Sequence, residues 1–388
     1  MDKFLKIAFA VILKIVLFPL RLCKIKKKCI IFIGLTGGNT YEYSCNLKYL
    51  SEYIQDKRPK EFEVYWIVNE PEKYKDIEKN QGLCFLKHYT LKSFYYLMTA
   101  NVIVSSGAYI PWFSFRKNQY VINTWHGGGA YKRIENAKPD ANWLTRKRAE
   151  ISAKNIDLFL SSSKLTTKYL IREAFLYQGE VMEKGMPRND CIVRGETQSA
   201  SQRVRAYYGI DKDEKVILYA PTYRKPSQEI VLEGEKLLSF LSENGEKWRF
   251  LYRMHRYQTE DSYMRVTGEE ILSANDFPDM QMLLCATDIL ITDYSSMIWD
   301  YSFLFRPCFL FVPDLTEYLK STGFHIDIHE WPFPLARTQK ELHRLIRQYD
   351  YEESRKAIEE HHLHLGNCET GQACEYTAKR IFDICKEK

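Results

Sequence analysis

The sequence lacks the patterns that mark several common classes of protein. Its ten cysteines are dispersed and none forms a Cys-x-x-Cys pair, which fits reduced thiols in a cytoplasmic protein better than a disulfide framework. No Gly-x-Ser-x-Gly elbow occurs, which argues against an esterase. No Walker lysine motif occurs either, so ATP hydrolysis is not indicated.

The sequence also lacks a recognisable metal site. Its one Asp-x-Asp pair, Asp211-Lys-Asp213, stands before a predicted strand and is typical of a turn rather than of a metal clamp. A second group of candidate ligands comprises His361, His362, His364, Cys368 and Cys374. Their spacing fits no standard zinc pattern, and a cluster on a helix surface is the simpler interpretation. We therefore expect neither a metal nor a cofactor.

Basic residues outnumber acidic ones only at the start of the chain. The formal net charge is +6, and residues 1–28 hold eight basic residues against one acidic residue, Asp2. The rest of the chain is near neutral and carries no basic stripe, so nucleic acid is not an expected partner.

The first 28 residues have the composition of a membrane-surface segment. Residues 4–20 are apolar but contain Lys6 and Lys14 and end near Pro19, so they are too short and too charged for a comfortable spanning helix. The basic run at 21–28 follows, and no small-residue cleavage site does. We expect residues 1–28 to lie on an anionic membrane, peripheral on the cytoplasmic face; a spanning helix and a buried first helix are the alternatives.

The body of the chain alternates short apolar strands with helices. Its 388 residues predict two domains, and the alternation predicts doubly wound parallel sheets of the α/β class. The predicted strands are 30–35, 62–69, 84–87, 102–105, 120–124 and 156–161 in the first half, and 215–219, 248–253, 289–292 and 308–312 in the second. The predicted helices include 44–57, 91–100, 165–175, 297–304, 338–360 and 370–386.

These elements predict three parts after the membrane-associating segment. They are an N-terminal Rossmann-like domain at 29–195, a C-terminal Rossmann-like domain at 196–345, and C-terminal helices at 346–388 that pack back across the cleft. Ligands of doubly wound sheets bind at the carboxyl ends of the strands, where polar turns gather in this sequence.

The stretch 286–301 is the strongest of these turns. The apolar strand 289–292 runs into a helix through Asp293, Tyr294, Ser295 and Ser296. The first N–H groups of a helix have no partner within it and favour negative charge, so this turn predicts a phosphate site. Taken alone, the stretch fits an ordinary capped turn equally well.

Two further polar groups follow predicted strands. His126 precedes Gly127, Gly128 and Gly129, whose backbone can approach a ligand closely, and the histidine can act as a base. His255 is flanked by Arg253 and Arg256, which suit diphosphate oxygens. A cleft between two domains would bring these groups and the 293–296 turn together. The Gly-rich turn at 36–40 is a weaker candidate that fits a plain turn as well.

Five motifs occur in an order seen in one family. They are Asn123-Thr-Trp-His126-Gly127, Gly185-Met-Pro-Arg188-Asn-Asp190, Leu218-Tyr-Ala-Pro221-Thr222-Tyr-Arg224, Arg253-Met254-His255 and Thr292-Asp293-Tyr-Ser295-Ser296-Met-Ile-Trp-Asp300. With them, residues 100–335 resemble the CDP-glycerol glycerophosphotransferases that build teichoic acids and related polyol-phosphate polymers. The segments 314–324 and 366–371 also look like this family.

The resemblance implies a GT-B fold with the active site in the cleft between two Rossmann-like domains. It implies transfer of glycerol phosphate from CDP-glycerol to a membrane-linked glycan or polyol-phosphate acceptor, with release of CMP, in wall or capsule polymer synthesis. His126 would be the base and His255 would contact the diphosphate. The substrate-binding residues would be Gly127, Gly128, Gly129, Ala130, Arg188, Pro221, Thr222, Arg224, Arg253, Met254, Asp293, Ser295, Ser296 and Asp300.

The sequence departs from the family pattern at two places. The family usually continues His-Gly-Thr-Pro-Leu-Lys where this chain has Gly128, Gly129 and Ala130, and it usually has His-Pro where Arg256 follows His255. The acceptor and the polyol are therefore open, and CDP-ribitol is an alternative donor. A nucleotide-sugar glycosyltransferase on the same fold and a non-catalytic membrane scaffold are the competing interpretations.

Overall fold

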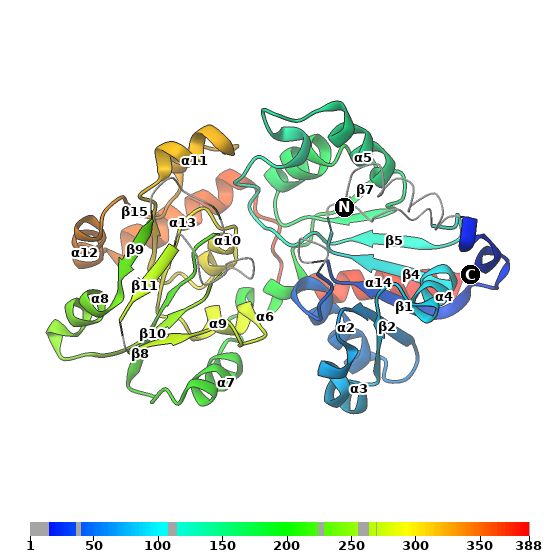
Figure 1. The fold of residues 1–388 in the computed structure, drawn as a ribbon, viewed down its shortest axis with the longest axis horizontal. Helices are drawn as coiled ribbons and strands as arrows, with labels where there is room; N and C mark the ends of the chain where they lie inside the picture. The colour runs from blue at the N-terminus through cyan, green and yellow to red at the C-terminus, as the bar shows by residue number, and fades with distance from the viewer. Residues whose placement is uncertain are drawn as a thin grey trace. The chain divides into compact units, whose positions relative to one another are not determined.

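The chain forms two compact units, which the computed structural model describes over residues 15–35, 40–107, 115–222, 224, 229–254, 264–268 and 270–387. Unit 1 comprises residues 1–126, 135–190 and 368–388, and unit 2 comprises residues 127–134 and 191–367. Figure 1 shows both as sheets covered by helices.

Unit 1 is a doubly wound sheet of seven parallel strands. Its strands are β1 (Lys26–Ile33), β2 (Glu63–Val68), β3 (Leu83–Lys87), β4 (Ala100–Ser105), β5 (Tyr120–Asn123), β6 (Leu158–Leu160) and β7 (Glu180–Met182). Its α-helices are α2 (Cys45–Lys57), α3 (Lys75–Gln81), α4 (Leu91–Thr99), α5 (Trp143–Ala153) and α14 (Ala373–Glu387), with the π-helix η4 (Thr166–Ala174). Its 3-10 turns are η1 (Phe18–Leu22), η2 (Pro71–Tyr74), η3 (Glu135–Ala137) and η5 (Pro187–Asn189).

The strand order in unit 1 is β3-β2-β1-β4-β5-β6-β7. Residues 29–33 of β1 are all buried, as expected for a parallel sheet covered on both faces. One face packs against α2 and against α14, whose Ala378 and Ile381 join Ile30, Phe32 and Trp66 in a single core. In Figure 1 the red helix α14 lies beside β1 and β4, although it is the last helix of the chain.

Unit 2 repeats the design with six parallel strands. The strands are β8 (Glu214–Tyr219), β10 (Lys247–Tyr252), β12 (Ile271–Ser273), β13 (Ile289–Thr292), β14 (Cys308–Phe311) and β15 (Leu335–Ala336), and β9 (Ile230–Glu233) pairs with β11 (Met264–Thr267) beside them. The α-helices are α6 (Asp190–Val193), which starts at the end of unit 1, α7 (Gln198–Tyr208), α8 (Gly234–Leu241), α9 (Met280–Ala286), α10 (Met297–Ser302), α11 (Leu315–Ser321), α12 (Gln339–Arg347) and α13 (Tyr351–Leu365). Two 3-10 turns are η6 (Ser242–Asn244) and η7 (Ile328–Glu330).

The strand order in unit 2 is β12-β10-β8-β13-β14-β15. The chain therefore winds outward in one direction from β8 and in the other from β13, so the order reverses between these two neighbours. Alternate residues of both strands, such as Ile217, Tyr219, Ile289 and Ile291, enter one core with α8 and α12.

The predicted α/β class with parallel sheets is confirmed, and two predicted elements need correction. Strand β1 begins at Lys26 rather than at residue 30, because Lys26 is already paired with Ala100 of β4 and Cys29 with Glu63 of β2. The helix predicted over 338–360 is two helices, α12 and α13. They separate at 348–350, where the Asp350 side chain accepts a hydrogen bond from the N–H of residue 353 and caps α13.

Within the described part of the chain, no helix is both long enough and apolar enough to cross a membrane. Residues 1–14 of the predicted membrane-associating segment lie outside the described residues. In the part that is described, Ile15, Val16, Phe18 and Leu22 are exposed, with relative exposures of 60–81%.

Candidate active site

The strand order of unit 2 reverses where β8 and β13 lie side by side, with Ile291 opposite Tyr219. Ligands of doubly wound sheets bind beyond the carboxyl ends of the strands at such a point. Two polar turns that the sequence predicted in this unit follow these strands: residues 221–224 come after β8, and residues 293–296 come after β13. The topology thus brings together residues that are 70 positions apart in the sequence.

The buried carboxylate of Asp293 joins the two turns. It accepts hydrogen bonds from the Thr222 N–H at 3.0 and 2.9 Å and from the Thr222 hydroxyl at 2.6 Å. The side chain of Asp293 is fully buried, and its oxygens also accept from the N–H of Tyr294. Asp293 therefore fixes the geometry of the turn after β8.

Arg224 and Asp314 complete this cluster. The Arg224 guanidinium pairs with Asp293 and donates to Asp314 at 2.8 Å, and it lies over the ring of Tyr294 at 4.7 Å. Burial disfavours the charge on Arg224, but the two carboxylates outweigh burial and raise the pKa of this group. Asp314 was not predicted as a site residue; only its segment resembled the family, and nothing in its spacing indicated a partner 90 residues away.

Helix α10 begins at the turn that the sequence marked as a phosphate site. The Ser295 hydroxyl accepts from the N–H of Met297 at 3.3 Å, whereas the Ser296 side chain makes no capping hydrogen bond. Both serines are partly exposed. Asp300 is buried, and its carboxylate accepts from Gln281 at 2.8 Å.

The glycine loop, residues 127–134, belongs to unit 2 and lies against α10. A side chain at Gly128 would overlap Cδ1 of Trp299 and would stand 2.8 Å from its Cγ. Gly129 has a φ of +71°, a conformation that favours glycine. Glycine at position 128 thus has a steric reason, because the indole occupies the space where a threonine side chain would stand.

His126 is the last residue of unit 1 before this loop. Its Nδ1 lies 3.0 Å from the carbonyl oxygen of Ser106, just after β4, and its ring stacks near Trp125 with centroids 3.9 Å apart. A carbonyl oxygen can only accept, so this bond requires a proton on Nδ1. In the neutral imidazole the other nitrogen, Nε2, then carries the lone pair that a base needs.

Arg188 holds the backbone that carries His126. It is 3% exposed, and its guanidinium donates to the carbonyl oxygen of His126 at 3.0 Å. Asn46, at the start of α2, donates to the carbonyl oxygen of Trp125 at 3.0 Å and accepts from the N–H of Arg188 at 3.3 Å. Asn46 was missed by sequence reasoning, because an asparagine in the first turn of a helix is an ordinary observation.

Glu369 was missed for a similar reason. Its carboxylate accepts from the N–H of Met186 at 2.8 Å and from the Asn189 side chain at 3.0 Å. Asp190 accepts from the N–H groups of Ala373 and Cys374 at 2.8 Å. These hydrogen bonds join the motif at 185–190 to Glu369 and to the start of α14. Both the motif and the segment 366–371, which contains Glu369, resembled the family.

The motif Arg253-Met254-His255 is only partly described. The Arg253 guanidinium donates to the carbonyl oxygens of Ala274 and Phe277 at 2.8 and 2.6 Å, and the N–H of Met254 donates to Asn275 at 2.7 Å. His255 lies outside the described residues, as does the Gly-rich turn at 36–39. The structure therefore places Arg253 and Met254 after β10 but tests no role for His255.

The predicted site residues fall into two groups. Unit 2 holds Gly127, Gly128, Gly129, Ala130, Pro221, Thr222, Arg224, Arg253, Met254, Asp293, Ser295, Ser296 and Asp300. Unit 1 holds His126 and Arg188, which contact each other. The substrate contacts predicted for all of them stay predictions.

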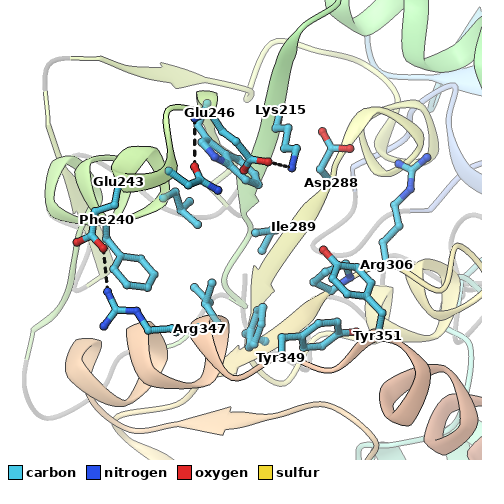
Figure 2. Close-up of a pocket in the computed structure, with 16 residues that line it drawn as sticks. Lys215, Phe240, Glu243, Glu246, Asp288, Ile289, Arg306, Arg347, Tyr349 and Tyr351 are labelled. Atoms are coloured by element: carbon cyan, nitrogen blue, oxygen red, sulfur yellow. Dashed lines mark hydrogen bonds and ion pairs between the residues drawn. The ribbon is translucent and has the colours of Figure 1, made fainter.

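A separate pocket of unit 2 lies at the amino ends of the strands, opposite their carboxyl ends. Its volume is about 540 Å³, and it is lined by Lys215, Trp248, Ile289 and Phe309, which stand in the first two residues of their strands. Figure 2 shows the Lys215–Glu246 and Arg347–Glu243 pairs at this pocket. None of its lining residues is a predicted site residue.

Among the described residues, no group of three or more His, Cys, Asp or Glu side chains is arranged to hold a metal ion. His361 instead meets the Tyr131 hydroxyl through Nε2 at 3.0 Å, and His362 meets the Ser302 hydroxyl through Nε2 at 2.6 Å. The Cys374 thiol lies 3.6 Å from the carbonyl oxygen of Pro187.

Two doubly wound parallel sheets with polar turns after their strands are typical of nucleotide-binding α/β proteins. Residues 16–383 match the family described as CDP-Glycerol:Poly(glycerophosphate) glycerophosphotransferase, and the chain belongs to this family. The class of enzyme that the sequence predicted, a CDP-glycerol glycerophosphotransferase of teichoic acid synthesis, is confirmed.

Two curated relatives illustrate the match. A teichoic acid poly(glycerol phosphate) polymerase of Bacillus spizizenii is 29% identical over 332 residues, which are 81% of this chain and 82% of that protein. The protein of the same description from Bacillus subtilis is 30% identical over 339 residues, which are 84% of this chain. There the match spans only 44% of the relative's length.

The wall teichoic acid polymerase TagF has a similar solved structure. It superimposes with a TM-score of 0.80 at 26% identity, covering 99% of this chain and 98% of that chain. TagF has also been solved with either of two histidines replaced, in one case after a soak with CDPG.

Proposed function

We propose that this protein transfers glycerol phosphate from CDP-glycerol to a hydroxyl of a membrane-linked glycan or polyol-phosphate acceptor and releases CMP. We further propose that its two units form a GT-B enzyme whose substrates meet between the two carboxyl edges. The observation that carries the proposal is the joined pair of turns at the switch point of unit 2, where Asp293 holds Thr222 beside the start of α10.

The donor belongs to unit 2 in this proposal. The partly exposed hydroxyls of Ser295 and Ser296 stand at the start of α10, where N–H groups favour a phosphate. Thr222 and Pro221 line the same edge, and Arg253 and His255 contact the diphosphate. Asp293 and Arg224 act through their neighbours, because their charged groups bond within the protein.

The acceptor hydroxyl is deprotonated by His126 in this proposal. The Ser106 carbonyl fixes the proton on Nδ1, so Nε2 receives the proton of the acceptor. The acceptor oxygen attacks the phosphorus atom bonded to glycerol, and the bond from that phosphorus to the oxygen of CMP breaks. The electron pair of that bond leaves with CMP. Positioning and stabilisation of charge supply most of the catalysis in such a phosphoryl transfer.

The same proposal places the protein on the cytoplasmic face of an anionic membrane. Two described surfaces of unit 1 have suitable chemistry. One is the stretch 15–22, which exposes Ile15, Val16, Phe18 and Leu22 and precedes basic residues. The other is α5, where Trp143 and Ile151 are 77% and 55% exposed beside Arg146, Lys147 and Arg148. Apolar groups next to basic ones bind the interface of anionic bilayers.

Product analysis tests the function. The purified protein is incubated with CDP-glycerol, CDP-ribitol or UDP-sugars and a membrane-derived lipid acceptor, and the release of CMP or UDP is followed. We expect CMP release with growth of the lipid product by glycerol phosphate. Acceptor-dependent UDP release with no reaction of CDP-glycerol would identify a glycosyltransferase instead, and donor binding without turnover on any acceptor would indicate a scaffold.

A further inference from the structure

The glycine loop is anchored in unit 2 by its own backbone as well as by side chains. The N–H of His325 donates to the carbonyl oxygen of Tyr131 at 2.9 Å, and the N–H of Arg133 donates to the carbonyl oxygen of Gly323 at 3.2 Å. Tyr131 is 1% exposed, and its ring lies against Trp331. The second half of the loop is therefore seated firmly.

In the first half of the loop, Gly128 lies against Trp299. This residue is fully buried in α10, three positions after Ser296. Its indole lies edge-on to the ring of His362, with the ring centroids 5.3 Å apart. Nε2 of His362 also forms a hydrogen bond with the hydroxyl of Ser302, which lies in α10 like Trp299. A buried indole packed on both sides cannot move away to accept a larger loop residue.

Gly128 faces this indole with no room for a side chain. Its Cβ position would lie 2.8 Å from Cγ and 2.9 Å from Nε1 of Trp299, besides the overlap with Cδ1. The backbone of Gly128 does not have the positive φ that makes Gly129 depend on glycine. The indole, and not the backbone conformation, is thus what requires glycine at position 128.

We infer that Trp299 is a positioning residue that sets the glycine loop, through its contact with Gly128, at the distance from the start of α10 that the transfer reaction needs. The inference rests on the proposed function. The Gly128–Trp299 contact, which lies within unit 2, holds the loop that directly follows His126 in the sequence against the helix that directly follows Ser295 and Ser296. Neither residue needs to touch substrate.

A double-mutant cycle tests this inference. Gly128→Ala pushes the loop off the indole, and we expect kcat for CMP release to fall on the order of 100-fold, because a displacement of about 1 Å can cost that much. The KM for CDP-glycerol should change by less than about threefold, because the groups that bind the donor are not displaced. Trp299→Leu in the Gly128→Ala background should restore kcat at least about tenfold, since leucine can turn its methyl groups away from residue 128.

A control and a second test keep the result interpretable. As the control, Gly195→Ala introduces a strained residue in open space, at a φ of +73°, and should leave kcat unchanged. As the second test, Trp299→Leu alone takes the indole away from Gly128 and should lower kcat by about tenfold, on the scale of a displaced loop. It serves if the Gly128→Ala protein does not fold.

Normal kcat in a folded Gly128→Ala protein would overturn the inference. A double variant whose kcat is no higher than the value expected from multiplying the two single effects would also overturn it. Normal kcat in Trp299→Leu would overturn it where the alanine variant cannot be purified. A wild-type protein that releases no CMP from CDP-glycerol would refute the proposed function instead, and this outcome is read before any variant is compared.

Discussion

At the scale of single residues, the proposed chemistry uses side chains that hydrogen bonds within the protein hold in place. His126 has its tautomer set by the Ser106 carbonyl and its backbone held by Arg188. Thr222 has both its N–H and its hydroxyl on Asp293. Catalytic groups that are held in place need no reorganisation during the reaction.

Replacement of His126 should abolish most of the turnover without loss of donor binding. For His126→Ala we expect kcat to fall about 10²–10⁴-fold, the usual contribution of a general base. The dissociation constant of CDP-glycerol, measured by calorimetry, should stay within about threefold of the wild-type value, because a group that acts only in the transition state does not contribute to donor binding. Wild-type turnover in this variant would eliminate the residue as the base.

Replacement of Asp293 should instead destabilise unit 2. Asp293→Ala removes an ion-pair partner of the buried Arg224 and the hydrogen-bond acceptor of the Thr222 hydroxyl. Breaking such a buried charged network typically costs about 3–5 kcal/mol, measurable by urea unfolding. Glu243→Ala breaks the exposed pair with Arg347 and should leave the urea midpoint unchanged. Equal midpoints for the two variants would contradict the structural role of Asp293.

At the scale of secondary-structure elements, helix α13 supports the site through two buried histidines. Burial lowers the pKa of His361 to about 3 and that of His362 to about 4. Both are therefore neutral in the folded protein at physiological pH. Their rings meet the Tyr131 hydroxyl, the Ser302 hydroxyl and the Trp299 indole.

This burial makes stability depend on pH in a defined direction. The unfolded chain binds protons at these histidines below a pH of about 6.5, whereas the folded protein does not until about pH 4. The stabilisation is therefore complete above about pH 6.5 and is lost as the pH falls, by up to about 1.4 kcal/mol per pH unit for each histidine.

Urea unfolding at pH 7.5, 6 and 5 measures this effect. We expect a fall in unfolding free energy that is smaller in His362→Gln, because glutamine takes up no proton in this range. The variant will be less stable overall, so the comparison rests on the slope with pH and not on the absolute value. An identical slope in the two proteins would contradict the neutral state of His362.

Helix α5 should carry part of the attachment to a membrane. Trp143→Ser combined with Ile151→Ser removes its exposed apolar groups, and we expect weaker sedimentation with vesicles that contain phosphatidylglycerol. Leu363→Ser in unit 2 removes a residue that is 80% exposed and serves as the matched control. Equal loss of binding in the two variants would show that general surface hydrophobicity, rather than α5, is responsible.

The sequence was sufficient for elements whose signal is local. Strand β13 has the predicted bounds, β8 differs from prediction by one residue at one end and β10 by one residue at each end, because an apolar run before a polar turn is a clear pattern. Short edge strands such as β7 and β15 were missed, since two or three residues carry no periodicity. Among site residues, the turn at 293–296 was predictable, whereas Asn46, Asp314 and Glu369 act only through partners far away in the sequence.

At the scale of the whole molecule, each unit uses segments that are distant in the sequence. Unit 1 is completed by α14, whose Ala378, Ile381 and Ile384 are part of the core under β1 and β4. Glu369 and Asp190 join this last segment to the motif that contains Arg188. The position of His126 therefore depends on residues near the other end of the chain.

A core substitution in α14 should destabilise unit 1 selectively. Ile381 is fully buried, and Ile381→Ala should cost about 2–5 kcal/mol. Hydrogen exchange should then accelerate in β1 and β4 while β8 and β13 keep their protection. Uniform acceleration in both sheets would show that the units unfold as one, and unchanged exchange in β1 would contradict the place of α14 in this core.

The late position of α14 in the chain also constrains synthesis on the ribosome. Strands β1 to β7 and helix α2 emerge first, but α14, which packs on the same face of their sheet as α2, is translated only after all of unit 2. At about 5–20 residues per second, that face lacks α14 for on the order of ten seconds or more while residues 191–372 are made. During this interval Ala378, Ile381 and Ile384 cannot yet contribute to the core that contains Ile30 and Phe32. Unit 1 is thus predicted to complete its core only after α14 has been translated.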